Sequence, residues 1–159
     1  MSEIHIYSEV NAPASHVWHL MADFGGVARW NPNLKDAFLL EGSSNTGIGA
    51  RRQCNLKDGK NYLREEIVGY EEGKSLTISV YDGTMPLSAA RLTASIEERG
   101  DACCQIRFSM NYEARPGILG ALMATMARPM MRGLLKKAQR GLAREAEAHG
   151  LASTPQRAA

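Results

Sequence analysis

Residues 51–67 read RRQCNLKDGKNYLREEI, and this stretch decides the fold. Asp58-Gly59 is a two-residue signal for a type I′ hairpin turn, with alternating apolar and polar residues on both sides. If these two residues form the turn, Arg52 lies opposite Glu65 on the partner strand. The residues that share this face are Ala50, Arg52, Cys54, Leu63, Glu65 and Ile67. The stretch therefore predicts an antiparallel hairpin with a guanidinium and a carboxylate side by side on its inner, apolar face.

Alternating residues predict further strands on both sides of this hairpin. The expected strands are 4–10, 34–40, 48–56, 61–69, 76–81, 87–97 and 102–113, with a helix pair within 13–30 and a long helix over 118–149. Short connections imply an antiparallel meander, which must cover one of its faces. We therefore expect an α+β domain over residues 1–149, in which a seven-stranded curved sheet surrounds the long helix, and a flexible tail over 150–159.

The last hairpin allows a second prediction of pairing. With a three-residue turn at Arg99-Gly100-Asp101, the strands align in a defined register. The expected pairs are Ile96 with Cys104, Ala94 with Ile106, Leu92 with Phe108, Ala90 with Met110, and Ser88 with Tyr112. This hairpin thus contributes both small and large side chains to the inner face.

The long helix carries an apolar stripe with steps of three and four residues. Its members are Leu119, Leu122, Met123, Met126, Met130, Leu134, Ala138 and Leu142. Pro129 lies inside the helix, and we predict a bend there because proline removes a helical hydrogen bond.

These faces indicate a cavity between sheet and helix. Small inner residues leave space, and flexible methionines adapt to irregular ligands, although methionine on a helix face is also common core filler. Arg52 and Glu65 would be costly in a dry core, so they either orient a ligand or form a half-exposed structural pair at the sheet edge. Trp30 either shapes the cavity mouth or anchors a loop. Tyr112 either offers its hydroxyl to a ligand or bonds to backbone.

Composition and charge limit the remaining functions. A formal net charge of +2 over 159 residues does not support nucleic-acid binding. We interpret the basic residues from Arg128 to Arg144 as the solvated face of the helix rather than a phosphate or membrane patch. Three cysteines without metal-site spacing fit a reducing compartment and predict no metal. Without a signal peptide or a bilayer-spanning stretch, we expect a cytoplasmic protein, as a monomer or a homodimer, with no cofactor.

Several short motifs resemble the polyketide cyclase/dehydrase branch of the START-like (SRPBCC, pollen-allergen-like) superfamily. They are Pro13 with Val17-Trp18, Asp23-Phe24, Trp30-Asn31-Pro32, residues 47–52, Asp58-Gly59, Arg64-Glu65 and residues 83–87, followed by the long helix. The resemblance covers roughly residues 3–148. It implies a helix-grip fold with a cavity for hydrophobic molecules such as polyketides, lipids, sterols, quinones or plant hormones, and it matches Trp30, Arg52 and Glu65 to cavity positions. The chain departs from it at Ala90-Arg91, where relatives often carry an aromatic residue.

Three functions remain as hypotheses. The first is binding or transport of a small hydrophobic molecule, with Arg52 meeting a carboxylate, enol or carbonyl and Glu65 fixing Arg52. The second is a cyclase, aromatase or dehydratase, with Glu65 or Tyr112 as catalytic candidates, although a carboxylate paired with arginine is a weak base. The third is a ligand-responsive interaction module with mobile loops at Gly25-Gly26 or Gly83-Thr84. The predicted ligand contacts are Trp30, Arg52, Cys54, Glu65, Ile78, Leu92, Phe108, Met110, Tyr112, Met123, Met126 and Met130.

Overall fold

The computed structural model describes residues 2–152, and the side chains of residues 2–117 and 125–148. Its elements are β1 (Ser2–Val10), α1 (Ala14–Ala22), the 3-10 helix η1 (Phe24–Arg29), β2 (Leu34–Leu39), β3 (Arg51–Leu56), β4 (Tyr62–Glu71), β5 (Ser75–Gly83), β6 (Leu87–Gly100), β7 (Cys103–Ala114) and α2 (Ile118–Ala152). This order of elements confirms the predicted one. The helix α2 runs three residues beyond the predicted end at 149, and residues 153–159 of the predicted tail lie outside the described residues.

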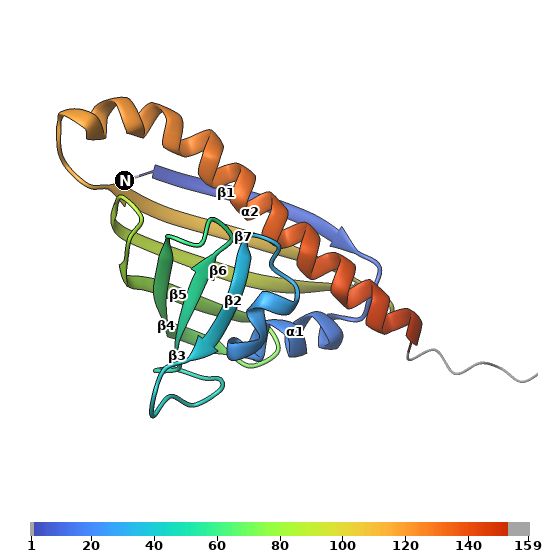
Figure 1. Ribbon diagram of the computed structural model, residues 1–159. Helices are drawn as coiled ribbons and strands as arrows, with labels where there is room; N and C mark the ends of the chain where they lie inside the picture. The colour runs from blue at the N-terminus through green and yellow to red at the C-terminus, as the bar shows by residue number, and fades with distance from the viewer. Residues whose placement is uncertain (1, 153–159) are drawn as a thin grey trace, which may run out of the picture.

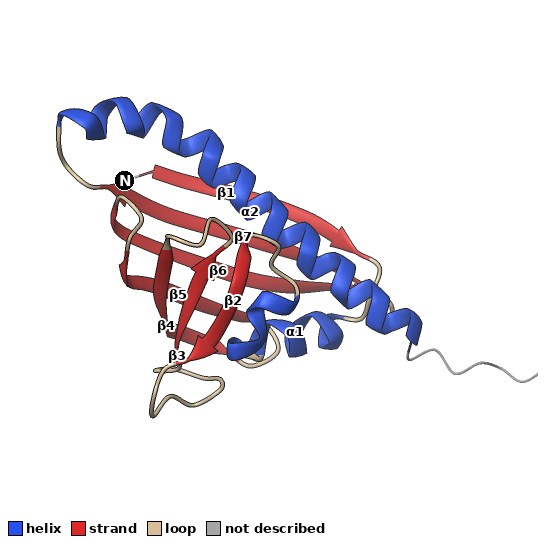
Figure 2. Cartoon of the chain, viewed as in Figure 1, coloured by secondary structure: helices blue, strands red, loops and turns tan. Residues whose placement is uncertain are grey.

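All seven strands form one antiparallel sheet in the order β1-β7-β6-β5-β4-β3-β2. Strands β2 to β7 follow one another as a meander, and β1 completes the sheet by pairing with β7. Figures 1 and 2 show the curved sheet with α2 running across it, while α1 and η1 lie at one end. The arrangement is the α+β helix-grip fold that the sequence predicts. None of the described helices has an apolar stretch long enough to cross a bilayer.

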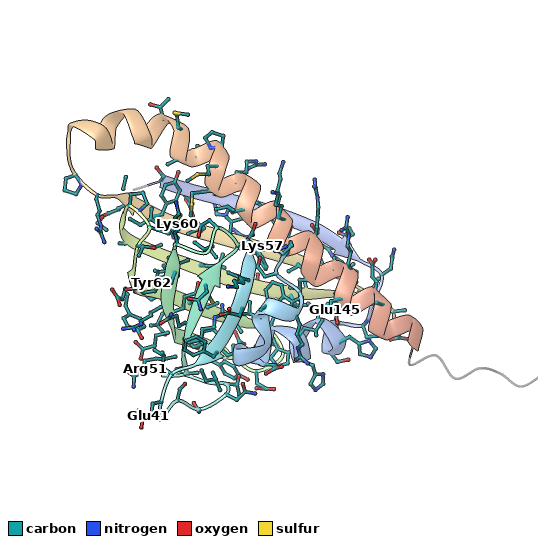
Figure 3. All side chains as sticks on the ribbon, in the orientation of Figure 1. Glu41, Arg51, Lys57, Lys60, Tyr62 and Glu145 are labelled. Carbon is teal, nitrogen blue, oxygen red and sulfur yellow. The ribbon has the colours of Figure 1, made fainter. Side chains whose placement is uncertain are left out.

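The register of β3 and β4 is the predicted one. Arg52 pairs with Glu65, and Cys54 pairs with Leu63. Arg52 is buried, whereas the adjacent Arg51 is exposed and lies on the outside of the molecule (Figure 3). The alternation of faces along a strand thus directs one of two neighbouring arginines inward.

The predicted register of β6 and β7 is wrong by two residues. Leu92 pairs with Met110 and Ala90 pairs with Tyr112, because the turn is tighter than predicted and a bulge lies between Glu98 and Gly100. Since side chains alternate with a period of two, a shift of two residues keeps every side chain on its predicted face. The inner face therefore keeps its composition, but its cross-strand neighbours change.

The helix α2 remains helical through Pro129. In Figure 1 its first turns run at an angle to the remainder, as expected for a long helix that contains proline. The buried residues of its described part are Met131, Leu135, Ala138, Gln139, Leu142 and Ala146.

The predicted stripe is wrong at two of its members. Met126 is 72% exposed and Met130 is 49% exposed. Each step of four residues turns a helix by about 400°, so repeated steps of four drift by about 40° each. Four such steps place Met126 about 160° away from the buried Leu142. The stripe that faces the sheet instead passes through Met131.

A buried glutamine fixes α2 to the sheet. Gln139 is 1% exposed, and its Nε2 donates to the carbonyl oxygens of Ile6 (3.1 Å) and Ile106 (3.4 Å). Its Oε1 accepts a hydrogen bond of 2.7 Å from Ser8 Oγ. A buried amide is tolerated when its polar groups are bonded in this way. Gln139 therefore sets the position of the helix over β1 and β7.

Candidate functional site: a cavity between sheet and helix

A cavity of about 140 Å³ lies between the sheet, the η1 region and α2. It is far larger than the roughly 10–15 Å³ that one water needs. Its lining residues are Met21, Val27, Trp30, Asn31, Asn33, Leu34, Arg52, Cys54, Leu56, Leu63, Glu65, Leu76, Ile78, Val80, Met85, Leu87, Leu92, Ala94, Phe108, Met110, Met131, Leu134, Leu135 and Ala138. Most of these side chains are apolar, and a few polar groups are concentrated on β3, β4 and the segment after η1. Such a distribution is typical of sites for small organic molecules.

The charged pair of the cavity is formed by neighbouring strands. Arg52 Nε and Nη2 each lie 2.7 Å from Glu65 Oε2, and both side chains are largely buried, at 6% and 14% exposed. A buried charge is tolerated when it is paired and hydrogen-bonded. This geometry excludes a half-exposed pair at the sheet edge and confirms that the pair faces the cavity.

Phe24, the first residue of η1, holds Arg52 from the other side. Arg52 Nη1 donates to the carbonyl oxygen of Phe24 at 2.9 Å, and the guanidinium carbon lies 3.8 Å from the centre of the Phe24 ring. The ring face attracts the cation, and the carbonyl satisfies a further donor. The sequence indicated that Arg52 requires partners, but it gave no signal for this contact with η1.

Cys54 completes the polar cluster. Its Sγ lies 3.5 Å from Glu65 Oε2, within hydrogen-bonding range for sulfur. Burial raises the pKa of the Cys54 thiol well above its ordinary value, and the Glu65 carboxylate raises it further. The thiol is therefore a donor to Glu65 and is unsuited to act as a nucleophile at neutral pH.

The segment after η1 closes one side of the cavity. Trp30 lines the cavity, and its Nε1 donates to the carbonyl oxygen of Leu20 at 3.3 Å. Trp30 therefore has both predicted roles, because this bond anchors the segment. Asn33 Nδ2 donates to the carbonyl oxygen of Leu134 in α2 at 2.8 Å. Asn31 also lines the cavity, and its Oδ1 accepts from the Asn33 backbone at 3.1 Å. The lining positions of Asn31 and Asn33 were not predicted, and their only signal was the polar sequence around Pro32.

Eight of the predicted contact residues line the cavity: Trp30, Arg52, Cys54, Glu65, Ile78, Leu92, Phe108 and Met110. Their contact with a ligand stays a prediction. The expected placement is wrong for Met126 and Met130, which are exposed, while Met131 takes their place. The Met123 side chain lies outside the described residues.

Tyr112 is not among the lining residues. It is 3% exposed, and its hydroxyl has no hydrogen-bond partner among the side chains and backbone that the structure describes. Tyr112 pairs with Ala90 on β6, two residues from its predicted partner Ser88. The predicted bond from the Tyr112 hydroxyl to backbone is therefore wrong, and its contact with a ligand stays a prediction.

Comparison with known proteins identifies a family. A family model described as "Polyketide cyclase / dehydrase and lipid transport" matches residues 2–147. No curated protein sequence matches the chain.

Solved structures share the fold at low sequence identity. A protein from Thermus thermophilus is 16% identical with a TM-score of 0.78, covering 93% of this chain and 99% of its own. A START superfamily protein from Mycobacterium smegmatis is 17% identical with a TM-score of 0.69, covering 96% of this chain and 99% of its own. Norcoclaurine synthase from Thalictrum flavum, solved with dopamine and hydroxybenzaldehyde, is 16% identical with a TM-score of 0.71, covering 93% of this chain and 87% of its own. These similarities show the fold and no more.

Proposed function

Because the chain belongs to the polyketide cyclase/dehydrase and lipid transport family, we propose that it binds and carries a small, mostly apolar organic molecule in the cavity under α2. The observation that supports this proposal most strongly is a largely apolar cavity that contains one buried ion pair, Arg52–Glu65. Burial of apolar surface provides the driving force for binding, and the polar cluster orients the ligand.

Two features favour this function over catalysis. Glu65 Oε2 already accepts from Arg52 Nε and Cys54 Sγ and lies 2.7 Å from Arg52 Nη2, so protonation of this oxygen would disrupt these contacts. The thiol of Cys54 stays protonated at neutral pH, because burial raises its pKa. The described lining residues thus offer Glu65 alone as a candidate base, without a second titratable group suited to act as its acid partner.

A cyclase or dehydratase remains a second candidate because Glu65 lies in the cavity wall of a family that includes such enzymes. Its test is Glu65→Gln, assayed with a poly-β-keto thioester. Loss of turnover in this variant, with binding of the thioester retained, would favour the enzyme. Absence of turnover in the unmodified protein supports a carrier.

The binding proposal is tested by filling the cavity. Ala138 faces the cavity from α2, and the adjacent Lys137 is exposed. We expect Nile red, a neutral apolar dye, to bind the unmodified protein and the Lys137→Phe control equally. Ala138→Phe places a ring in the cavity and is expected to weaken dye binding by at least about tenfold, which corresponds to about 1.4 kcal/mol. Equal dye binding by both variants, with both folded by circular dichroism, would contradict the proposal.

A further inference from the structure

The charges that line the cavity cancel. Among the described lining residues, Arg52 and Glu65 are the two that carry charge, and their charged atoms lie 2.7 Å apart. An ionised group taken into an apolar site is costly unless a counter-charge pairs with it. The cavity therefore offers an incoming ion no unpaired partner.

The hydrogen bonds of the pair leave a defined set of groups for a ligand. All described contacts of the Glu65 side chain with Arg52 and Cys54 end on Oε2, which accepts from Arg52 Nε and Cys54 Sγ and lies 2.7 Å from Arg52 Nη2. An ionised carboxylate accepts at both oxygens, so Oε1 is the acceptor that remains.

Arg52 keeps donors next to this acceptor. Of the five N–H groups of a guanidinium, the described hydrogen bonds engage the one on Nε and one on Nη1, which bonds to Phe24, while Nη2 is in ion-pair contact with Glu65. One N–H on each terminal nitrogen remains. The cluster thus presents a hydrogen-bond acceptor and hydrogen-bond donors together, without net charge.

We propose that the cavity selects neutral molecules that carry a hydroxyl group on an apolar skeleton, such as phenols or alcohols, over the corresponding carboxylates. This inference rests on the proposed function, because it names the ligand class of the same cavity. The ligand hydroxyl donates to Glu65 Oε1 and accepts from Arg52. A carboxylate at this place would face the Glu65 carboxylate and would meet an arginine whose charge is already neutralised.

The test compares 2-naphthol with 2-naphthoate, which share one ring system. At pH 7 the phenol is neutral and the carboxylate is ionised. Each compound is titrated against protein-bound Nile red. We expect 2-naphthol to displace the dye at a concentration about tenfold or more below that of 2-naphthoate. The formal net charge of the protein, +2, favours the anion at long range and so does not explain such a preference.

Three outcomes overturn the inference. Equal affinities, or tighter binding of 2-naphthoate, contradict the ligand class while leaving the proposed function intact. Displacement by neither compound, with the dye bound, has the same meaning. Failure of the dye itself to bind overturns the proposed function and this inference with it.

A charge-removing variant sharpens the test. Glu65→Gln keeps the shape of the side chain but leaves Arg52 as an unpaired cation, so we expect the preference to reverse in favour of 2-naphthoate. Glu66→Gln is the matched control, since Glu66 is adjacent on β4 and pairs with Arg51 on the opposite face. The control is expected to keep the original preference, and an unchanged preference in folded Glu65→Gln would contradict the inference. The comparison in the unmodified protein stands even if Glu65→Gln does not fold.

Discussion

The carbonyl oxygen of Trp30 lies 1.9 Å from the position that a Cβ atom on Gly141 would occupy. The ring carbon Cδ of Pro32 is 2.9 Å from the same position. The absence of a side chain at Gly141 therefore lets α2 approach the segment that closes the cavity.

We expect Gly141→Ala to lower the free energy of unfolding by about 1–3 kcal/mol, because the added methyl group forces α2 and this segment apart. Gly133→Ala is the control, since a Cβ atom there meets nothing within 4 Å. Alanine favours helix over glycine, so the control is expected to gain about 0.5–1 kcal/mol. Urea unfolding followed by circular dichroism measures both. A gain in stability at both positions would show that this close approach does not exist.

We expect substitutions of Ser8 and Gln139 to have strongly coupled effects on the free energy of unfolding, because the two side chains share a hydrogen bond. Ser8→Ala leaves the buried Oε1 of Gln139 without its donor, and we expect a loss of about 1–3 kcal/mol. In a Gln139→Leu background the same change removes no partner and is expected to cost much less. The double-mutant cycle measures this difference by urea unfolding, and additive losses would argue against the bond.

The cavity cluster predicts different costs for breaking and for replacing the ion pair. Arg52→Met leaves Glu65 as a largely buried, uncompensated charge, and we expect a loss of about 3–5 kcal/mol. Arg52→Met combined with Glu65→Leu removes both charges and is expected to restore much of that loss. Thermal unfolding of the unmodified protein, Arg52→Met and the double variant provides the comparison. A double variant no more stable than Arg52→Met would contradict the burial of the pair.

The register of each hairpin could be predicted from the sequence only where the turn residues define the turn. Asp58-Gly59 defines a two-residue turn, so the pairing of Arg52 with Glu65 could be predicted. The β6–β7 turn contains a bulge, whose position local sequence does not determine, and the predicted register slipped by two residues. The faces survived this slip because the side-chain period is also two.

The helix was harder to predict than the sheet. Steps of three and four fit more than one stripe on α2, and the stripe through Met126 drifts around the helix. Contacts between distant segments, such as Arg52 with Phe24 or Gln139 with Ser8, depend on tertiary packing that periodicity does not describe. The cavity wall was therefore largely predictable on β3 to β7 and at Trp30, but only in part on α2 and not at Asn31 and Asn33.

The thiol of Cys54 predicts a change of stability at alkaline pH. Burial raises the pKa of this thiol in the folded protein above its ordinary value of 9.0. Above pH 9.0 the unfolded chain releases the thiol proton while the folded protein retains it, so stability falls as the pH rises. We expect Cys54→Ala to show a shallower decline between about pH 9 and 10.5, by up to about 1.4 kcal/mol per pH unit. Urea unfolding across this range tests it, and parallel curves would contradict the burial of the thiol.

The central claim is that the space between the concave sheet and α2 receives an apolar ligand. The most direct test is to titrate 15N-labelled protein with 2-naphthol and follow its amide chemical shifts. We expect saturable shifts at residues whose side chains face the cavity, such as Cys54, Ile78, Leu92 and Ala138. Outer-face positions such as Arg51 and Arg107 are expected to change little. Saturable shifts confined to the outer face would contradict the account.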